Sequence, residues 1–302
     1  MFPAILTTLF FALSGVTGQK VAIRLGAQWG NFVRLSIAAV FLGLISLLLF
    51  PDSFHHRTFL WFFVSGLVGF GLGDVALFAA YERLGSRLTI LLNLCLAPVF
   101  ALSIEWLWLG NRPVWKVLVC VAVILLGVGF AIMRGSVNRV RPERKGRFSV
   151  GVIAAVIAGF GQGTGAVISR KAESVAKLSQ IEIHGISAAF QRVLAGVLVG
   201  FLVVLVLRFL SRRSLVIPGL VHHRKVCGWL FGAALFGPVI GVSCFQWALK
   251  TQESGVVLAV VALTPIVMMP LSAVTEKDIP GPWSILGAVV AVVGVMALYL
   301  WA

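Results

Sequence analysis

Long runs of apolar residues, separated by short polar stretches, form the main pattern along this 302-residue chain. A membrane-spanning helix needs about 20 mostly apolar residues, and runs near that length recur from one end of the chain to the other. These runs lack the strict alternation that the wall of a β-barrel requires. We therefore predict an all-α membrane protein with about ten transmembrane helices. The predicted spans lie near 3–23, 30–50, 59–80, 88–109, 115–133, 149–169, 184–207, 226–249, 255–275 and 284–302.

Composition excludes a water-soluble globule. Apolar residues make up 60% of the chain and charged residues only 12%, whereas a soluble domain carries roughly 25% charged residues. The four cysteines lie in apolar runs without C-x-x-C spacing, so we expect no structural disulfide. The histidine pairs at 55–56 and 222–223 lack metal-ligand spacing, and no phosphate-binding loop occurs. We predict neither a metal site nor another cofactor.

Basic residues outnumber acidic ones, 25 to 10, and gather in 134–147 and 208–225. Because these stretches flank apolar runs, we interpret them as juxtamembrane charge that attracts lipid head groups, and we expect no nucleic-acid partner. The positive-inside rule places 134–147 in the cytoplasm and both chain ends outside. No N-x-S/T glycosylation site occurs, which favours a multi-pass protein of the cytoplasmic (inner) membrane.

The two halves of the chain resemble each other. The matched residues are Pro98 with Pro265, Pro113 with Pro280, Gly127 with Gly294, and Arg34 with Arg192. Five spans per half make the second half enter the membrane from the opposite side, which is the inverted-repeat architecture of secondary transporters. We predict two inverted five-helix repeats, at 1–133 and 149–302, joined by a basic linker at 134–148.

Two long segments of the chain have a characteristic sequence, FGLGDVALFAAYERLGSRLTILLNLCLAPVFALSIEWLWLGNRP and FGPVIGVSCFQWALKTQESGVVLAVVALTPIVMMPLSAVTEK. These segments resemble EamA-type members of the drug/metabolite transporter superfamily, and the resemblance extends along essentially the whole chain. Pro98 and Pro265 match prolines that such proteins commonly carry in the fourth helix of each repeat. The L-G-E-[KR] turn that commonly follows is replaced by 110–112 in the first half, and 276–278 keeps an acidic turn in the second. The resemblance implies export, with both chain ends in the cytoplasm. This orientation is opposite to the one that the positive-inside rule gives, so the sequence leaves the orientation open.

Ionisable residues inside predicted spans are the first candidates for a substrate or ion pathway, because burying one in hydrocarbon costs at least ~2.5 kcal/mol. Asp74 could couple protons or neutralise a cationic substrate group, or it could form a salt bridge with Arg34. Arg34 and Arg192 could bind an anionic substrate or gate one mouth, or they could anchor lipid head groups. Glu105, near the end of its span, could act in the pathway or reach the interface.

Neutral polar residues and prolines complete the set of candidates. Asn93, Gln162 and Gln246 could hydrogen-bond a substrate reversibly, or could join helices to one another. Trp247 could form an aromatic wall of a cavity or lie at the membrane interface. Pro98 and Pro265 weaken helices, and we predict hinges there.

These patterns favour a secondary transporter, not an enzyme, that exports a small polar metabolite such as an amino acid, driven by a proton or substrate gradient. One alternative is an intramembrane aspartyl protease, because Gly71–Asp74 reads G-x-G-D. That chemistry needs a second membrane carboxylate, and Asp52 and Asp278 lie in predicted loops. Another alternative is a flippase-type protein with a lateral opening lined by Arg34 or Arg192.

Overall fold

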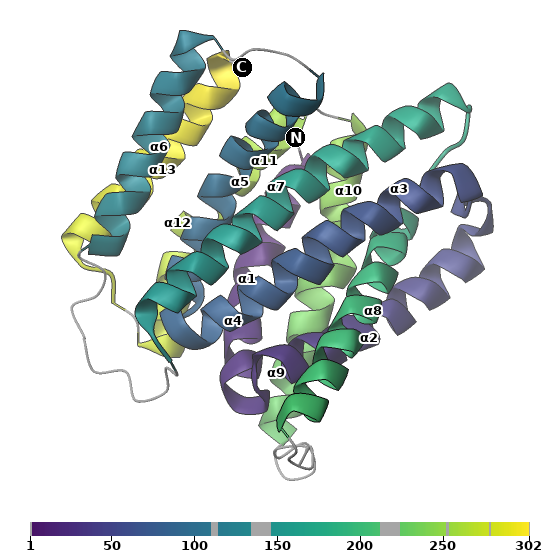
Figure 1. The fold of residues 1–302 in the computed structure, drawn as a ribbon, viewed down its shortest axis with the longest axis horizontal. Helices are drawn as coiled ribbons and strands as arrows, with labels where there is room; N and C mark the ends of the chain where they lie inside the picture. Colours follow the sequence, from purple (N-terminus) through teal and green to yellow (C-terminus); the bar gives the residue numbers. More distant parts are fainter. Residues whose placement is uncertain are drawn as a thin grey trace.

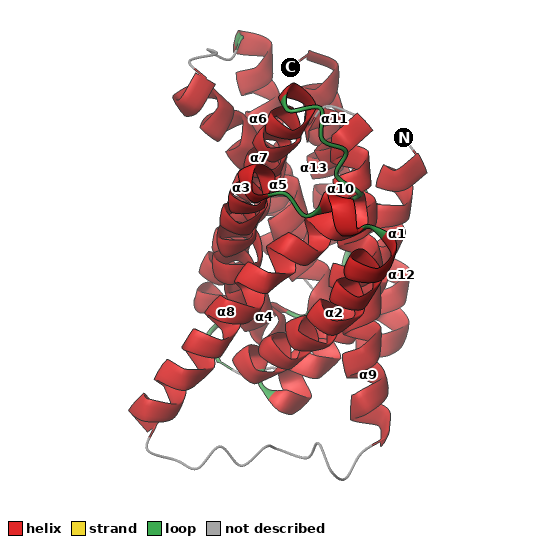
Figure 2. Ribbon diagram, turned by 90° about the vertical axis from the view of Figure 1, so that its right-hand side faces the viewer, coloured by secondary structure: helices red, strands yellow, loops and turns green. Residues whose placement is uncertain are grey.

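A computed structural model describes most of the chain, and its regular elements are helices throughout (Figure 2). No strand forms among the described residues. The described residues are 2–109, 114–133, 146–211, 224–251, 254–277 and 279–301. The turn at 110–112, nearly all of the predicted linker 134–148 and most of the basic stretch 208–225 therefore lie outside the described residues.

In the first half, most helices coincide with the predicted spans, and one span is divided in its middle. There α3 and α4 continue into each other through a short wide turn, η2, of the π-helical type. The elements are α1 (Phe2–Leu25), α2 (Ala27–Leu49), the 3₁₀ turn η1 (Pro51–Ser53), α3 (His56–Gly66), η2 (Leu67–Gly73), α4 (Asp74–Leu84), α5 (Ser86–Leu109) and α6 (Trp115–Met133).

The second half also begins with two long helices, which are followed by a divided span. A second π-helical turn, η3, divides this span, as η2 divides α3 from α4. The elements are α7 (Phe148–Leu178), α8 (Gly185–Ser211), α9 (Arg224–Ala234), η3 (Leu235–Gly241), α10 (Val242–Thr251), α11 (Ser254–Val261), α12 (Thr264–Glu276) and α13 (Pro282–Trp301).

Seven helical stretches in the described residues are long and apolar enough to cross a membrane. The other predicted spans correspond to two shorter apolar stretches, Leu118–Val128 and Pro282–Ala297, and to the pair α11 and α12. The span predicted at 255–275 is interrupted, because α11 ends at Val261 and α12 begins at Thr264. The prediction of about ten full spans is therefore matched only in part.

Pro265 explains where α12 begins. Proline has no backbone N–H and fits the first turn of a helix, where that donor would have no partner, and Pro265 occupies this position. Pro98, in contrast, lies inside the continuous helix α5. The two prolines predicted as matched hinges therefore occupy different local structures, one after a break and one within a helix.

Single glycines separate consecutive helices, and carboxylates cap two of the helix starts. Gly26 and Gly85 have φ values of +84° and +81°, which glycine adopts without strain. Directly after Gly26, the backbone N–H of Ala27 donates to the Glu82 carboxylate, at 2.7 Å. The N–H of Ser86 donates to Glu276, at 3.1 Å. A carboxylate at a helix N-terminus satisfies a free donor and interacts favourably with the helix dipole.

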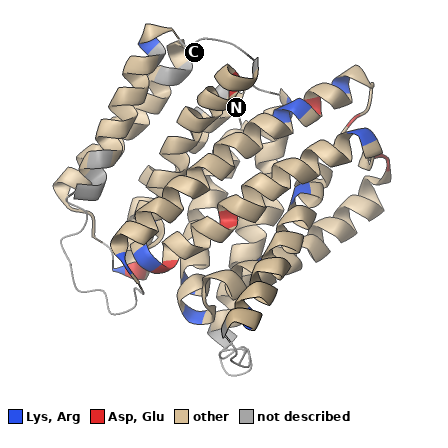
Figure 3. Ribbon diagram, viewed as in Figure 1, with Lys and Arg blue, Asp and Glu red and all other residues tan. Residues whose placement is uncertain are grey.

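The helices pack around α1, which contacts α2, α4, α9, α10, α12 and η3 (Figure 1). At one edge, α6 and α13 lie side by side. Glycines permit this close approach. A side chain on Gly127 would overlap the backbone of Ala291, and one on Gly294 would come within 2.9 Å of Ile124. Charged residues lie mostly toward the two ends of the helices (Figure 3). Charge in the middle of the bundle is therefore the exception.

Candidate functional site

A central cavity lies between helices from both halves of the chain. It encloses about 630 Å³ of empty space, counting its open mouth. Three of its lining side chains are charged, Arg34, Asp74 and Arg192. The others are mainly apolar or neutral and polar: Phe11, Ser14, Gly69, Phe70, Gly73, Leu77, Tyr81, Ile90, Asn93, Leu94, Ala158, Gln162, Gly237, Pro238, Val242 and Phe245.

The turns η2 and η3 shape two walls of this cavity. Both are seven residues long and rich in glycine, with the sequences LVGFGLG and LFGPVIG. A π-helical turn inserts extra backbone into a helix and is frequent at functional sites. Asp74 is the first residue after η2, and its backbone N–H donates to the carbonyl of Gly69. The wide turn therefore sets the direction of the one acidic side chain on the cavity wall.

Asp74 forms a buried salt bridge with Arg34. The two side chains are 14% and 5% exposed, and Arg34 also donates to the side-chain oxygen of Asn31, at 3.0 Å. The Arg34 guanidinium lies 4.7 Å from the centre of the Phe78 ring, a cation–π contact. The salt bridge with Arg34, one of the alternatives that the sequence left open for Asp74, is thus present in the structure.

Arg192 lies on the same cavity, but no described carboxylate forms an ion pair with it. The residue is 3% exposed, and its Nε has no hydrogen-bond partner among the described residues. Its guanidinium lies 5.4 Å from the centre of the Phe70 ring, and it interacts with Asp74 only through longer-range electrostatics. Both predicted arginines are therefore buried at the cavity, so neither is placed to anchor a lipid head group.

Each arginine passes beside a glycine that belongs to the other half of the chain. A side chain on Gly237 of η3 would come within 3.0 Å of Arg34 Nη1. A side chain on Gly69 of η2 would come within 2.8 Å of Arg192 Nη2. The glycines of the two π-helical turns thus make room for the guanidinium groups at the cavity.

The structure brings five of the eight predicted pathway residues together. Asn93 and Gln162 line the cavity with the three charged residues. Gln246 is fully buried but is not on the cavity wall, and both atoms of its amide have no partner among the described residues. Trp247 is 47% exposed and faces away from the cavity. Glu105, near the end of α5, accepts a hydrogen bond from Ser254, at 3.0 Å.

Sequence reasoning missed the aromatic and hydroxyl side chains of the cavity: Phe11, Ser14, Phe70, Tyr81 and Phe245. Phenylalanines within apolar runs are indistinguishable in sequence from those that face lipid. Tyr81 carried a usable signal, because the chain has only two tyrosines and a buried phenol usually needs a polar neighbour.

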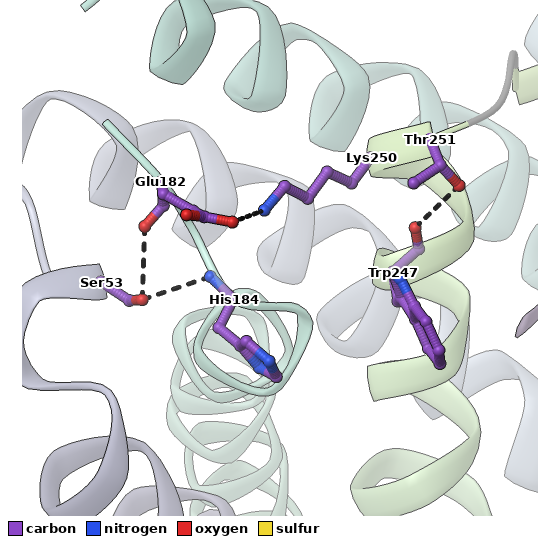
Figure 4. Close-up of polar contacts among 6 residues, drawn as sticks. All are labelled: Ser53, Glu182, His184, Trp247, Lys250 and Thr251. Carbon is purple, nitrogen blue, oxygen red and sulfur yellow. Dashed lines mark hydrogen bonds and ion pairs between the residues drawn. The ribbon is translucent and has the colours of Figure 1, made fainter. Parts of the chain in front are cut away.

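A second hollow lies between α2, the start of α8 and α10, and encloses about 1240 Å³ counting its open side. Its wall is mainly apolar, and Trp247 contributes to it. Figure 4 shows the polar rim, where Lys250 of α10 reaches Glu182 at 2.8 Å. Ser53 joins this rim by donating to the Glu182 carbonyl, at 3.4 Å, and accepting from the His184 N–H, at 3.2 Å. The hollow is thus separate from the charged cavity.

Two groups on this rim have shifted pKa values. The hydrogen bond from Lys250, together with its positive charge, lowers the pKa of Glu182 below its usual value of 4.5. Partial burial, helped by the charge of Lys250, lowers the pKa of His184 below its usual value of 6.5. Both shifts make the folded protein bind fewer protons than the unfolded chain in acid, so both reduce stability as the pH falls.

Replacing Glu182 with glutamine should therefore reduce the acid sensitivity of the fold slightly. The stabilisation from Glu182 is complete at a pH above 4.5, the usual pKa of this group, and is lost as the pH falls through the lowered pKa. The measurement is the melting temperature of the purified protein from neutral pH to well below 4.5. Identical curves for Glu182→Gln and wild type would contradict the expectation, although the effect is small for an exposed pair.

Comparison with known proteins adds to this geometry. A search of curated proteins found no match. A solved structure described only as a crystal structure of protein superposes with a TM-score of 0.59, over 99% of this chain and 95% of the other. Its sequence is 17% identical, so it shows a shared fold and nothing more.

A family model assigns the chain more specifically. The model of the EamA-like transporter family matches residues 1–133 and again residues 149–300. Together these stretches cover nearly all of the chain, including every helix that lines the central cavity. The chain is therefore a membrane protein of the EamA-like transporter family, within the drug/metabolite transporter superfamily.

Proposed function

We propose that this chain is a secondary transporter that exports a small polar metabolite, an amino acid or a related compound, across the cytoplasmic membrane. The observation that carries the proposal is the central cavity, where Arg34, Asp74 and Arg192 meet among helices of both halves. Charged groups inside membrane segments are costly and typically mark a substrate or ion pathway. No second carboxylate lines the cavity among the described residues, so the acid–base pair of an aspartyl protease is not formed there.

We further propose that 1–133 and 149–302 are inverted repeats, with 134–148 as the linker. Three features support this. The turns η2 and η3 occur in corresponding helices, Arg34 and Arg192 each pass beside a glycine of the opposite half, and the family model matches the two halves separately. Two similar bundles facing each other can exchange conformations, which gives states open to either side of the membrane.

Transport in this proposal uses the flexible points of the helices around the cavity. The break between α11 and α12, just before Pro265, interrupts the helix, and the proline within α5 removes one of the backbone hydrogen bonds that keep a helix stiff. Bending there would open and close the cavity. A cationic group on the substrate would compete with Arg34 for Asp74, and a proton or substrate gradient would supply the energy.

The test is transport by the purified full-length chain in liposomes. Labelled amino acids should exchange against unlabelled ones inside the vesicles faster than in protein-free liposomes. Asp74→Asn should lose this exchange, whereas Asp52→Asn, at an exposed carboxylate outside the cavity, should keep it. An imposed pH gradient should drive accumulation if protons are coupled. Movement of labelled phospholipid with no movement of any small polar solute would contradict the proposal.

A further inference from the structure

We propose that Arg192 is the anion-binding group of the central cavity, and that the substrate is a small solute with one carboxylate on an apolar body. The inference rests on the proposed function, because it names the chemistry of the solute that the cavity would carry. It starts from an imbalance of charge on the cavity wall and from the way Arg192 is held there.

The charged residues of the cavity wall carry one more positive than negative charge. The charged residues on the cavity wall are Arg34, Asp74 and Arg192. Asp74 is taken by Arg34 in a direct salt bridge, so one positive charge is left over. A carboxylate carries one negative charge and neutralises it, whereas a phosphate ester with two negative charges would leave an excess inside the membrane. An amine without a carboxylate would add a second unpaired positive charge, whereas in an amino acid the carboxylate offsets the ammonium group.

Arg192 is a buried charge without an ion-pair partner among the described residues. This residue forms no ion pair with any described residue, its Nε has no hydrogen-bond acceptor, and it is almost completely buried. A buried charge without a partner is strongly unfavourable. The guanidinium nonetheless lies on the cavity wall, where a ligand can reach it. Its planar arrangement of N–H donors matches the two oxygens of a carboxylate.

Close neighbours hold the Arg192 guanidinium in place. Glycines on two elements flank it, since a side chain on Gly69 would come within 2.8 Å of Arg192 Nη2 and one on Gly165 within 3.2 Å. The Phe70 ring lies on another side of the group. The group is thus confined between η2 and α7 while one side remains open to the cavity. Confinement of this kind reduces the entropy that ligand binding would otherwise cost.

The remainder of the cavity wall indicates what the rest of the solute is like. Beyond the charged groups, the wall is lined by the rings of Phe11 and Phe245 and by the side chains of Ile90 and Leu94. Apolar surface of this kind favours an apolar ligand body, while a few placed polar groups fix its orientation. A carboxylate attached to a small ring or a short hydrocarbon matches this division.

The experiment compares three probes of similar shape: benzoate, benzamide and benzylamine. Full-length protein in lipid nanodiscs is heated with each probe, and unfolding is followed by tryptophan fluorescence. A ligand that binds only the folded protein raises the melting temperature with its concentration. We expect benzoate to raise it and the neutral and cationic probes to leave it nearly unchanged.

Variants separate binding from folding. Arg192→Gln should melt at the same temperature as the wild type or higher without ligand, because an unpaired buried charge is removed. Its affinity for benzoate should fall by roughly 30-fold or more. Arg192→Lys, which keeps the charge, should retain part of the affinity. Arg87→Gln is the matched control, since Arg87 is also buried but donates to Ser284, at 2.6 Å, away from the cavity. It should melt lower yet keep the benzoate shift.

The outcomes distinguish this inference from the proposed function. An unchanged benzoate shift in Arg192→Gln, or equal shifts with all three probes, or no shift with benzoate, would overturn the assignment of Arg192. If liposomes exchange neutral or cationic solutes but benzoate does not bind, the chain is a transporter whose substrate is not a carboxylate. If benzoate binds through Arg192 but no solute is transported, Arg192 is an anion-binding group and the transporter proposal is wrong.

Discussion

Replacing Asp74 with alanine should lower the free energy of unfolding by about 3–5 kcal/mol, because breaking a buried ion pair leaves its partner uncompensated. Arg34 would lose its salt bridge and keep only the hydrogen bond to Asn31 and the contact with Phe78. Arg192 would lose its one nearby opposite charge as well. The measurement is reversible unfolding of the purified protein in mixed micelles, with transport in liposomes measured in parallel.

A double variant shows whether the loss comes from the stranded charge. Asp74→Leu combined with Arg34→Met removes both members of the pair, and replacing a buried pair with apolar side chains is often nearly neutral. The double variant should therefore recover most of the stability that Asp74→Ala loses, without recovering transport. If the losses of the two single substitutions simply add in the double variant, the two side chains are energetically independent and the expectation fails.

Replacing Gly66 with alanine should lower the free energy of unfolding by about 1–3 kcal/mol through overpacking. Gly66 ends α3, where it crosses α8. A side chain there would overlap the carbonyl oxygen of Arg192 and come within 2.7 Å of its Cα. Backbone atoms cannot move aside as a flexible side chain can, so α3 and α8 must separate. Because Arg192 is the residue displaced, transport should fall together with stability.

The chain provides a matched control for this substitution. Gly228 lies in α9, and a side chain there would meet no atom within 4 Å. Gly228→Ala should leave stability unchanged or raise it by up to about 1 kcal/mol, because alanine favours a helix over glycine. Both variants add one methyl group to a helix, and only their surroundings differ. Equal effects at the two positions would show that the close crossing of α3 and α8 is not a constraint on the fold.

Much of the charged site could be predicted before the structure was known. Asp74 stands out because an acid within an apolar run is costly to bury, and Arg34 is the partner that sequence reasoning named for it. The match between Arg34 and Arg192 indicated that both halves contribute. Gly127 and Gly294 were paired by the repeat, and the structure places both in the contact between α6 and α13.

Other features could not be predicted, because they depend on which face of a helix meets another. Gln246 and Trp247 are neighbours in sequence, yet the first is buried off the cavity and the second lies on an outer face. Pro98 and Pro265 look equivalent in sequence, but one lies within α5 and the other follows a break. The turns η2 and η3 have no sequence signal beyond their glycines and the proline in η3.

The amino-acid sequence by itself determined that this chain lies in a membrane, and it predicted a resemblance between the halves and a pathway that includes Asp74, Arg34 and Arg192. Those conclusions depend on composition and spacing, which do not change when the chain folds. Only the tertiary structure decided that Asp74 pairs with Arg34 and that Arg192 has no carboxylate partner in the part of the chain that the structure describes. That choice depends on distances between helices far apart in sequence, which the close contacts at Gly69 and Gly237 set.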